Sequence, residues 1–213
     1  ALGRTKPVKY WAILREDLDW TLPLTAALKA VLPTKGWNAT PAIEIKYPIT
    51  ATATDFATYW SQINASRAQV VIPIISAQGG QYMMTQYNAT KPMVLPVGID
   101  VQSQLDSFWA STSGKAAYEV IMQPLVNTNK TPLSKAFWTN YVGNYSVSPL
   151  YTGIGAYDAV YTLAWAIGSS SSLVSDKVVT ALETIKTTNG SAVEGSRVGA
   201  GGRLAFTKSH DLF

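Results

Sequence analysis

Four short, largely apolar segments, each followed by a helical pattern, constrain the fold of this chain more than any other feature of its sequence. They are residues 8–14 (VKYWAIL), 43–47 (IEIKY), 69–75 (QVVIPII) and 93–98 (MVLPVG). Segments of this kind are typical of strands in a buried sheet. Strands that alternate with helices form parallel sheets with right-handed crossovers. We therefore predict an α/β fold with a parallel sheet and helices on both of its faces.

Amphipathic helices are predicted between these strands. One follows Thr21, a plausible N-cap, and a second follows Thr54, which is expected to cap it. A third, short helix is predicted over residues 79–87. The apolar stripes of the first two helices consist of Leu24, Ala27, Leu28, Val31 and Leu32, and of Phe56, Tyr59, Trp60 and Ile63.

Two features depart from this simple pattern. Pro73 and Pro96 lie inside predicted strands, where a proline removes one hydrogen bond of the ladder. We therefore expect these strands to lie at an edge of the sheet or to be bulged at the prolines. Residues 118–122 (YEVIM) are a weaker candidate for a fifth strand.

The polar segment at residues 127–132 marks a change to a mainly helical pattern. Three helices with apolar faces are predicted over residues 133–142, 151–167 and 174–185. The sequence after them offers only a glycine-rich, hairpin-like stretch at residues 195–206, which is too small to cover three apolar faces. We infer that the sheet on which these helices pack belongs to residues outside this chain.

The composition indicates a globular protein and excludes several classes of site. Apolar residues make up 47% of the chain and charged residues 14%. The net charge of +4 comes from scattered cations, so no nucleic-acid interface is expected. Cysteine is absent and His210 is the only histidine, so we expect no metal site and no cysteine or Ser-His-Asp nucleophile. The glycine-containing segments at residues 153–155 and 199–202 lack the rest of a dinucleotide or phosphate loop, so no cofactor is expected.

Asparagine positions favour an exported protein. Asn38, Asn64, Asn88, Asn129, Asn144 and Asn189 each have Ser or Thr two positions later, the pattern of N-glycosylation sites. We interpret the chain as part of an extracellular glycoprotein, although polar loops rich in Asn and Thr are an alternative explanation. No apolar run is long enough to span a membrane, and Ala1 does not begin a signal peptide. An exported gene product is therefore expected to be longer than this chain.

Three loops are the predicted ligand site, because ligands of parallel α/β sheets bind outside the carboxyl ends of the strands. The loops are residues 15–20, 76–80 and 99–104, and they offer carboxylates, amides, glycines and an aromatic wall for a small zwitterionic or amide-bearing solute. The ligand-binding candidates are Asp17, Trp20, Ala77, Gln78, Gly79, Asp100 and Gln102, with Tyr151 from a later helix.

Simpler roles compete with ligand binding at several of these candidates. Asp17 and Asp100 could form an acid–base pair, but no neighbouring nucleophile is implied, and a carboxylate facing a ligand ammonium group explains Asp100 as well. Asp17 and Asp19 could instead cap the following helix, and Trp20 could be an ordinary core residue. We expect a binding protein that has no catalytic residues.

Several segments resemble the type I periplasmic binding proteins of branched-chain amino acid and amide importers. The segments are AILREDLDW, TATDFATYWSQINASRAQVVI, TPLSKAFWTNYVGNYSVSPLYTGIGAYDAVYTLAWAI and GGRLAFTKSHDL, between about Val8 and Leu212. The helix with Tyr157-Asp158-Ala159, which follows a helix with Phe137 and Tyr141, is the most specific of these. Trp20-Thr21 in place of the family's Tyr-Gly and the two strand prolines depart from the family pattern.

The resemblance implies two α/β lobes that close on a ligand. It assigns residues 7–122 to the second ligand-binding lobe, and residues 123–213 to the returning helices of the first lobe with a hinge hairpin. It also implies that Asp100 contacts the ligand ammonium group, that Trp20 lines the cleft, and that residues 77–79 form another wall. The Ser and Thr residues that hold the ligand carboxylate would lie in the amino-terminal half of the first lobe, which this chain lacks.

On this resemblance we expect the extracellular or periplasmic solute-binding component of an ABC transporter, membrane-anchored at full length. Its expected partners are a small-molecule solute (a branched-chain type amino acid or an amide), the membrane permease, and the missing amino-terminal part of the same protein, with self-association of the fragment as a further expectation. One alternative is the ectodomain of a signalling receptor. Another is an α/β enzyme of flavodoxin-like topology, which would need a phosphate loop where residues 15–20 are acidic and free of glycine.

Overall fold

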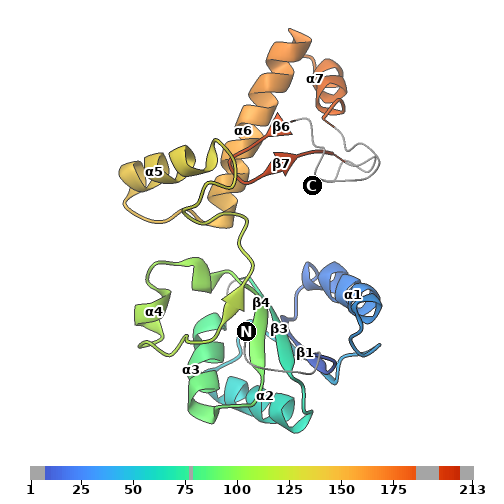
Figure 1. Cartoon of the computed structure of the whole chain (residues 1–213), viewed down its shortest axis with the longest axis vertical. Helices are drawn as coiled ribbons and strands as arrows, with labels where there is room; N and C mark the ends of the chain where they lie inside the picture. The colour runs from blue at the N-terminus through green and yellow to red at the C-terminus, as the bar shows by residue number, and fades with distance from the viewer. Residues whose placement is uncertain (1–7, 77–78, 186–196, 207–213) are drawn as a thin grey trace. The chain divides into compact units, whose positions relative to one another are not determined.

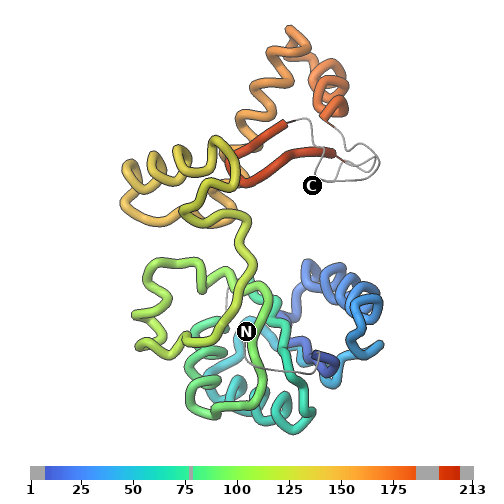
Figure 2. The backbone as a smooth tube through the Cα atoms, viewed as in Figure 1, coloured from blue at the N-terminus to red at the C-terminus, as the bar shows by residue number. Residues whose placement is uncertain are grey.

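The structure, a computed structural model, describes residues 8–76, 79–185 and 197–206 (Figures 1 and 2). The chain divides into two compact units. Unit 1 comprises Ala1–Met122 and unit 2 comprises Gln123–Phe213. Among the described residues, no helix is both long and apolar enough to cross a membrane.

Unit 1 is built on a five-stranded parallel sheet with the order β2-β1-β3-β4-β5. The strands are β1 (Trp11–Glu16), β2 (Ile43–Tyr47), β3 (Val70–Ile75), β4 (Leu95–Asp100) and β5 (Val120–Ile121). The helices are α1 (Thr21–Val31), the 3-10 helix η1 (Leu32–Lys35), α2 (Ala53–Ala65), α3 (Gly80–Thr90), the 3-10 helix η2 (Gln102–Gln104) and α4 (Phe108–Ser111). The predicted α/β class and all five predicted strands are confirmed.

Each face of this sheet carries its own hydrophobic core. On one face, α2, α3 and α4 pack over a core in which the Trp60 indole nitrogen donates a hydrogen bond to the Met83 carbonyl oxygen (2.8 Å). On the other face, α1 packs over Trp11, Ile13 and Ile74, all of which are buried. Helices therefore cover both faces, as predicted (Figure 1).

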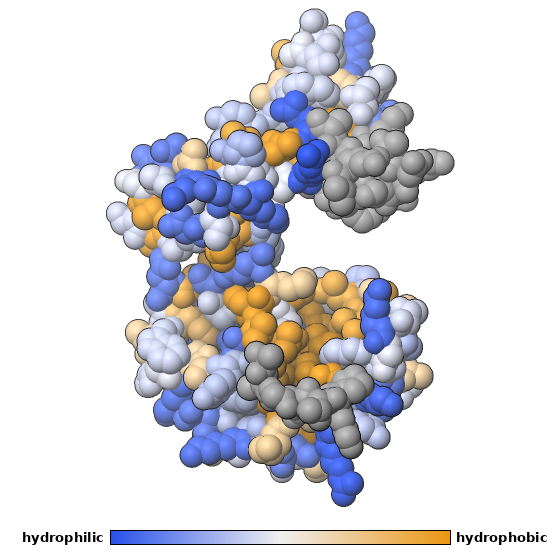
Figure 3. Space-filling model, in the orientation of Figure 1, coloured by the Kyte–Doolittle hydropathy of each residue, from blue (hydrophilic) through white to orange (hydrophobic). Residues whose placement is uncertain are grey.

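The helices of the described residues cover the second face only in part. Strand pairing aligns Ile13 with Ile72 and Val97 with Val120, and side chains alternate along a strand, so these residues and Met122 share that face. The exposed fraction is 0% for Ile13, under α1, but 48% for Val120 and 73% for Met122. Figure 3 shows a broad hydrophobic area on the visible side of unit 1. The β4–β5 half of this face is the less covered half.

The two strand prolines lie in interior strands, so the prediction that they mark an edge or a bulge is wrong. β3 and β4 pair on both sides of the prolines with unchanged register, from Val71↔Pro96 to Ile74↔Ile99. Gly98 lies against Pro73, and a Cβ added to Gly98 would be 2.8 Å from the Pro73 ring carbon Cδ. Gly98 therefore leaves the space that the Pro73 ring needs inside the sheet.

Two predicted N-caps are shifted. Trp20 is the N-cap residue of α1, and Thr21 is the first helical residue. In α2 the cap is Thr52, whose backbone N–H donates to the Asp55 carboxylate (2.7 Å) in a capping box, so the cap predicted at Thr54 is wrong. Asp55 is solvent-accessible. The hydrogen bond from the Thr52 backbone N–H favours the charged form of its carboxyl group and so lowers the pKa of Asp55.

Unit 2 contains the three predicted helices and the predicted hairpin. They are α5 (Ser134–Tyr145), α6 (Tyr151–Ser170), α7 (Ser175–Leu182) and the antiparallel strands β6 (Arg197–Val198) and β7 (Arg203–Leu204). Asp158 of α6 holds the hairpin turn: its two carboxylate oxygens accept hydrogen bonds from the backbone N–H groups of Ala200 (2.6 Å) and Gly201 (2.9 Å). Charge-assisted bonds of this kind are stronger than neutral ones, so this motif residue has a clear structural role.

The apolar stripe predicted on α6 is exposed in part. The buried residues of this helix are Ile154, Asp158, Thr162 and Ala166, whereas Val160 is 65% and Tyr161 is 59% exposed. The side of α6 that meets the rest of unit 2 therefore includes two polar residues, Asp158 and Thr162, while Val160 and Tyr161 are open to water.

Substituting Gly98 by Ala tests the account of the β3–β4 pairing. We expect Gly98→Ala to lower the free energy of unfolding by about 1–3 kcal/mol, because its Cβ would overlap Pro73. Gly155→Ala on α6 is the control, since a Cβ there meets nothing within 4 Å, and it should raise the unfolding free energy by up to about 1 kcal/mol. Urea denaturation measures both. A Gly98→Ala protein as stable as the parent would contradict this account.

Candidate functional site

The candidate site lies at the edge of the unit 1 sheet where the parallel strands end. β1 ends at Glu16, β3 at Ile75 and β4 at Asp100. In the order β2-β1-β3-β4-β5, the direction of strand addition reverses between β1 and β3. The loops that leave these two strands diverge, and such switch points are where open α/β sheets bind ligands.

Glu16 joins the two loops at this switch point. Its carboxylate is fully buried and its Oε2 accepts hydrogen bonds from the Ser76 hydroxyl (2.7 Å) and the Trp20 indole nitrogen (3.2 Å). The Trp20 ring also packs against the core under α1, so it is both a core residue and part of the edge. The sequence prediction overlooked Glu16, although its position as the last residue of an apolar strand was a usable signal.

Asp17 lies beside this cluster but faces water. Its side chain is 53% exposed and forms an ion pair with Lys46 (3.3 Å). The first turn of α1 contains no acidic residue and its N-cap makes no side-chain hydrogen bond, so the suggested capping role of Asp17 and Asp19 is not seen.

Glycines allow α3 to approach the end of β4. Gly79 has a left-handed φ of +109°, and a Cβ there would be 2.6 Å from the Phe56 ring. At Gly80 a Cβ would overlap the Asp100 carboxylate. The Gln102 backbone N–H donates to Asp100 Oδ1 (2.9 Å), while the Gln102 side-chain oxygen accepts from the Gln81 backbone (3.3 Å). Gly79, Asp100 and Gln102 therefore meet at one edge, which also carries Trp20.

The electrostatics of this edge are acidic. Asp100 is 1% exposed, and burial raises its pKa to about 6, opposed by hydrogen bonds from Glu119, Gln102 and Ser103. Burial, followed by the charges of Glu16 and Asp100, raises the pKa of Tyr47 well above its usual range. The sequence prediction also overlooked Glu119, because nothing in a short run such as YEVIM shows that its carboxylate faces Asp100.

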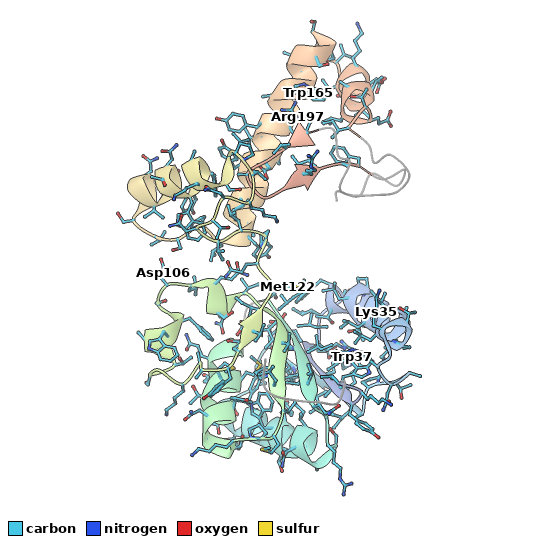
Figure 4. All side chains as sticks on the ribbon, viewed as in Figure 1. Lys35, Trp37, Asp106, Met122, Trp165 and Arg197 are labelled. Carbon is cyan, nitrogen blue, oxygen red and sulfur yellow. The ribbon has the colours of Figure 1, made fainter. Side chains whose placement is uncertain are left out.

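A cavity of about 250 Å³ lies next to the pair formed by Asp100 and Glu119. Its lining residues include Ser103, Asp106, Trp109 and Glu119, and Trp109 is 59% exposed. Figure 4 labels Asp106 on the loop that leads to α4. The sequence prediction overlooked this cavity, because α4 and its loop carry no recognisable motif.

The remaining candidates lie elsewhere. Tyr151 is the first residue of α6 in unit 2 and is 43% exposed. Ala77, Gln78 and His210 lie outside the described residues. Within residues 8–76, 79–185 and 197–206, no group of three or more His, Cys, Asp or Glu side chains could hold a metal ion.

Solved structures with the same fold are solute-binding proteins. One, from Rhodopseudomonas palustris BisB5 in complex with 3,4-dihydroxybenzoic acid, is 18% identical and matches 96% of this chain and 54% of that chain with a TM-score of 0.72. The leucine-binding protein from Thermotoga maritima MSB8 is 14% identical over 96% and 55%, with a TM-score of 0.73. The leucine-, isoleucine-, valine-, threonine- and alanine-binding protein from Brucella ovis is 12% identical over 96% and 49%, with a TM-score of 0.76.

This chain spans about half the length of those solved structures. The search of curated proteins found no match. A family model described as periplasmic binding protein matches residues 1–210, nearly the whole chain. The parallel sheet with helices on both faces agrees with the type I form of that fold. The chain belongs to the periplasmic binding protein family.

Proposed function

We propose that this chain is part of the extracellular or periplasmic solute-binding component of an ABC transporter, which captures a small polar solute and delivers it to a membrane permease. Membership of the periplasmic binding protein family supports the proposal. The observation that carries it is the switch-point edge, where buried Glu16 holds Trp20 and Ser76 together beside the end of β3. We further propose that the full-length protein is anchored at the membrane.

The acidic edge favours a solute with an ammonium or amide group. Glu16, Asp100 and Glu119 gather there, whereas Lys46, the cation paired with Asp17, lies on the outside of the edge. A negative potential at a rim attracts cations and repels anions. We therefore propose an amino acid of branched-chain type or an amide as the solute. One solved structure with the same fold, from Thermotoga maritima, is named as a leucine-binding protein.

The proposed ligand wall consists of the ligand-binding candidates from the sequence, and we propose different roles for them. The Trp20 ring and the backbone near Gly79 would contact the solute, while the deeply buried Asp100 would act through its charge. Asp17 and Gln102 are the other proposed members of the wall in unit 1. Ala77 and Gln78, outside the described residues, and Tyr151 of unit 2 stay candidates. Catalysis by Asp17 and Asp100 is disfavoured, because Asp17 is paired with Lys46 and Asp100 with Glu119.

We also propose that the amino-terminal part of the same protein covers the exposed apolar side of α6. Val160, Tyr161 and Leu163 are 65%, 59% and 48% exposed, and isolated domains rarely leave such contiguous residues open to water. The chain's coverage of about half of the solved relatives agrees with a second half of similar size.

Loss of the indole at position 20 tests the proposed ligand wall. In the full-length protein, we expect Trp20→Ala to weaken the binding of leucine at least about tenfold, a loss of about 1.4 kcal/mol. Trp109→Ala is the matched control, because Trp109 is an exposed tryptophan of unit 1 that lines the cavity beside Glu119. Isothermal titration calorimetry measures both. If Trp20→Ala binds leucine with unchanged affinity and Trp109→Ala binds it more weakly, the solute site is the cavity beside Glu119 and not the wall with Trp20.

The isolated chain should bind its solute weakly. If the full-length protein binds with a micromolar Kd, about −8 kcal/mol, one wall alone should retain about half of that free energy, a Kd on the order of millimolar. Calorimetric titration of this chain with the solute that stabilises the full-length protein measures this. A sub-micromolar Kd for the isolated chain would refute the proposal that the opposite wall is missing.

The exposed side of α6 should cause association. We expect this chain to form dimers or larger species in light scattering, and Tyr161→Ser to shift it toward monomer, because apolar area is removed from the contact. Leu173→Ser is the control, since Leu173 is 83% exposed but lies beyond the end of α6. A stable, compact monomer of the unsubstituted chain would count against this proposal.

A further inference from the structure

Asp100 and Glu119 are two acids that meet in the interior of unit 1 without a cation. Asp100 is the last residue of β4, and Glu119 directly precedes β5. Their carboxyl groups lie close enough to share a hydrogen bond once one of them carries a proton. No ion pair within the described residues joins either group to a lysine or arginine.

The hydrogen-bond inventory of the pair is incomplete without an added proton. Asp100 Oδ1 accepts the Gln102 backbone N–H (2.9 Å). Asp100 Oδ2 and Glu119 Oε1 are both buried, and neither receives a donor from the described residues. An ionised carboxylate only accepts hydrogen bonds, so two ionised groups cannot bond to each other. A buried acceptor without a donor is also costly.

We propose that Asp100 and Glu119 share one proton, and that this shared proton forms a pH-sensitive tie between β4 and β5. β5 is only two residues long and pairs with β4 through Val97↔Val120 and Gly98↔Ile121. The side-chain bond therefore adds a substantial part of the connection between these strands. The chain passes from unit 1 to unit 2 directly after β5, between Met122 and Gln123.

The surroundings of the pair supply further negative charge and no compensating positive charge. Glu16 of β1 raises the pKa of Asp100 through its charge, and Tyr47 of β2 faces both Glu16 and Asp100. Asp106 lines the same cavity as Glu119. From α3, the neighbouring residue is Gly80, which does not titrate. Every titratable group identified around the pair is thus acidic or phenolic, which opposes ionisation of both carboxyls.

The pair should release its protons in two steps well above the usual range of carboxylic acids. Burial raises the pKa of Asp100 from 3.8 to about 6, and burial together with the Asp100 charge raises that of Glu119 from 4.5 to about 9. These values describe the pair and not each residue alone. Between about pH 4 and pH 9 the folded chain therefore binds more protons than the unfolded chain. Its stability should fall as the pH rises through this range.

The test is the pH dependence of the melting temperature of this chain without ligand. Tryptophan fluorescence is a suitable signal, because five of the seven tryptophans (Trp11, Trp20, Trp37, Trp60 and Trp109) lie in unit 1. We expect the melting temperature to fall between pH 5 and pH 9.5. In Glu119→Gln the side-chain amide has N–H donors at every pH and so takes the place of the shared proton. The fall in melting temperature above about pH 7 should therefore disappear. Asp106→Asn, which alters the same cavity but not the pair, should keep the fall.

Infrared spectroscopy of the unsubstituted chain gives a second readout that does not depend on the variants folding. At pH 7 it should show a protonated carboxyl band that is lost at pH 10. Absence of that band at pH 7, or an equal fall in Glu119→Gln and the unsubstituted chain, would overturn the proposal. Stabilisation of the unsubstituted chain by Ca²⁺ at pH 7, lost in Glu119→Gln, would also overturn it, because a bound cation would then occupy the place of the proton.

Discussion

The need to cover both faces of a parallel sheet is the constraint on which the rest of unit 1 depends. Its central strands are apolar on both sides, so α2, α3 and α4 must pack on one face and α1 on the other. Right-handed crossovers then bring all carboxyl ends to one edge. The position of Glu16, Trp20, Gly79 and Asp100 at that edge is a consequence of this arrangement, since Glu16 and Asp100 are the last residues of their strands and Trp20 and Gly79 precede the next helices.

The sequence allowed most of the fold to be predicted, because hydrophobic periodicity is a local property. The five strands, the three late helices and the hairpin were all predicted from it. The prolines were misjudged for a physical reason: the accommodation of Pro73 depends on Gly98, which is distant in sequence and contacts it only in the folded sheet. The N-cap of α2 was also misplaced at Thr54, although Thr52 and Asp55 have the pattern of a capping box, because several threonines lie at the start of that helix.

The candidate site was predictable as a region but not as a set of contacts. The topology rule for parallel sheets selected, without any structure, loops that the structure does place at the carboxyl edge of the sheet. It could not show that Asp17 faces water and an exposed lysine while the preceding Glu16 is buried and bonded to Trp20. A shift of one residue at the end of a strand reverses the face on which a side chain lies. The strand order is also shared by flavodoxin-like folds, so the sheet alone does not separate binding proteins from enzymes, and the family assignment rests on the family match.

The bonds of Glu16 also determine how stiff this wall of the sheet is. Because one buried carboxylate accepts hydrogen bonds from both the Ser76 hydroxyl and the Trp20 indole, these two side chains are fixed to each other when the domain folds. Ordering loops at the moment of association consumes free energy that would otherwise appear as affinity. For Ser76 and Trp20 this entropy is lost during folding, so under the proposed function a solute at this edge would meet two side chains that are already in place. Discrimination among solutes of similar polarity would then depend on their shape, because side chains held in place do not adjust to each solute.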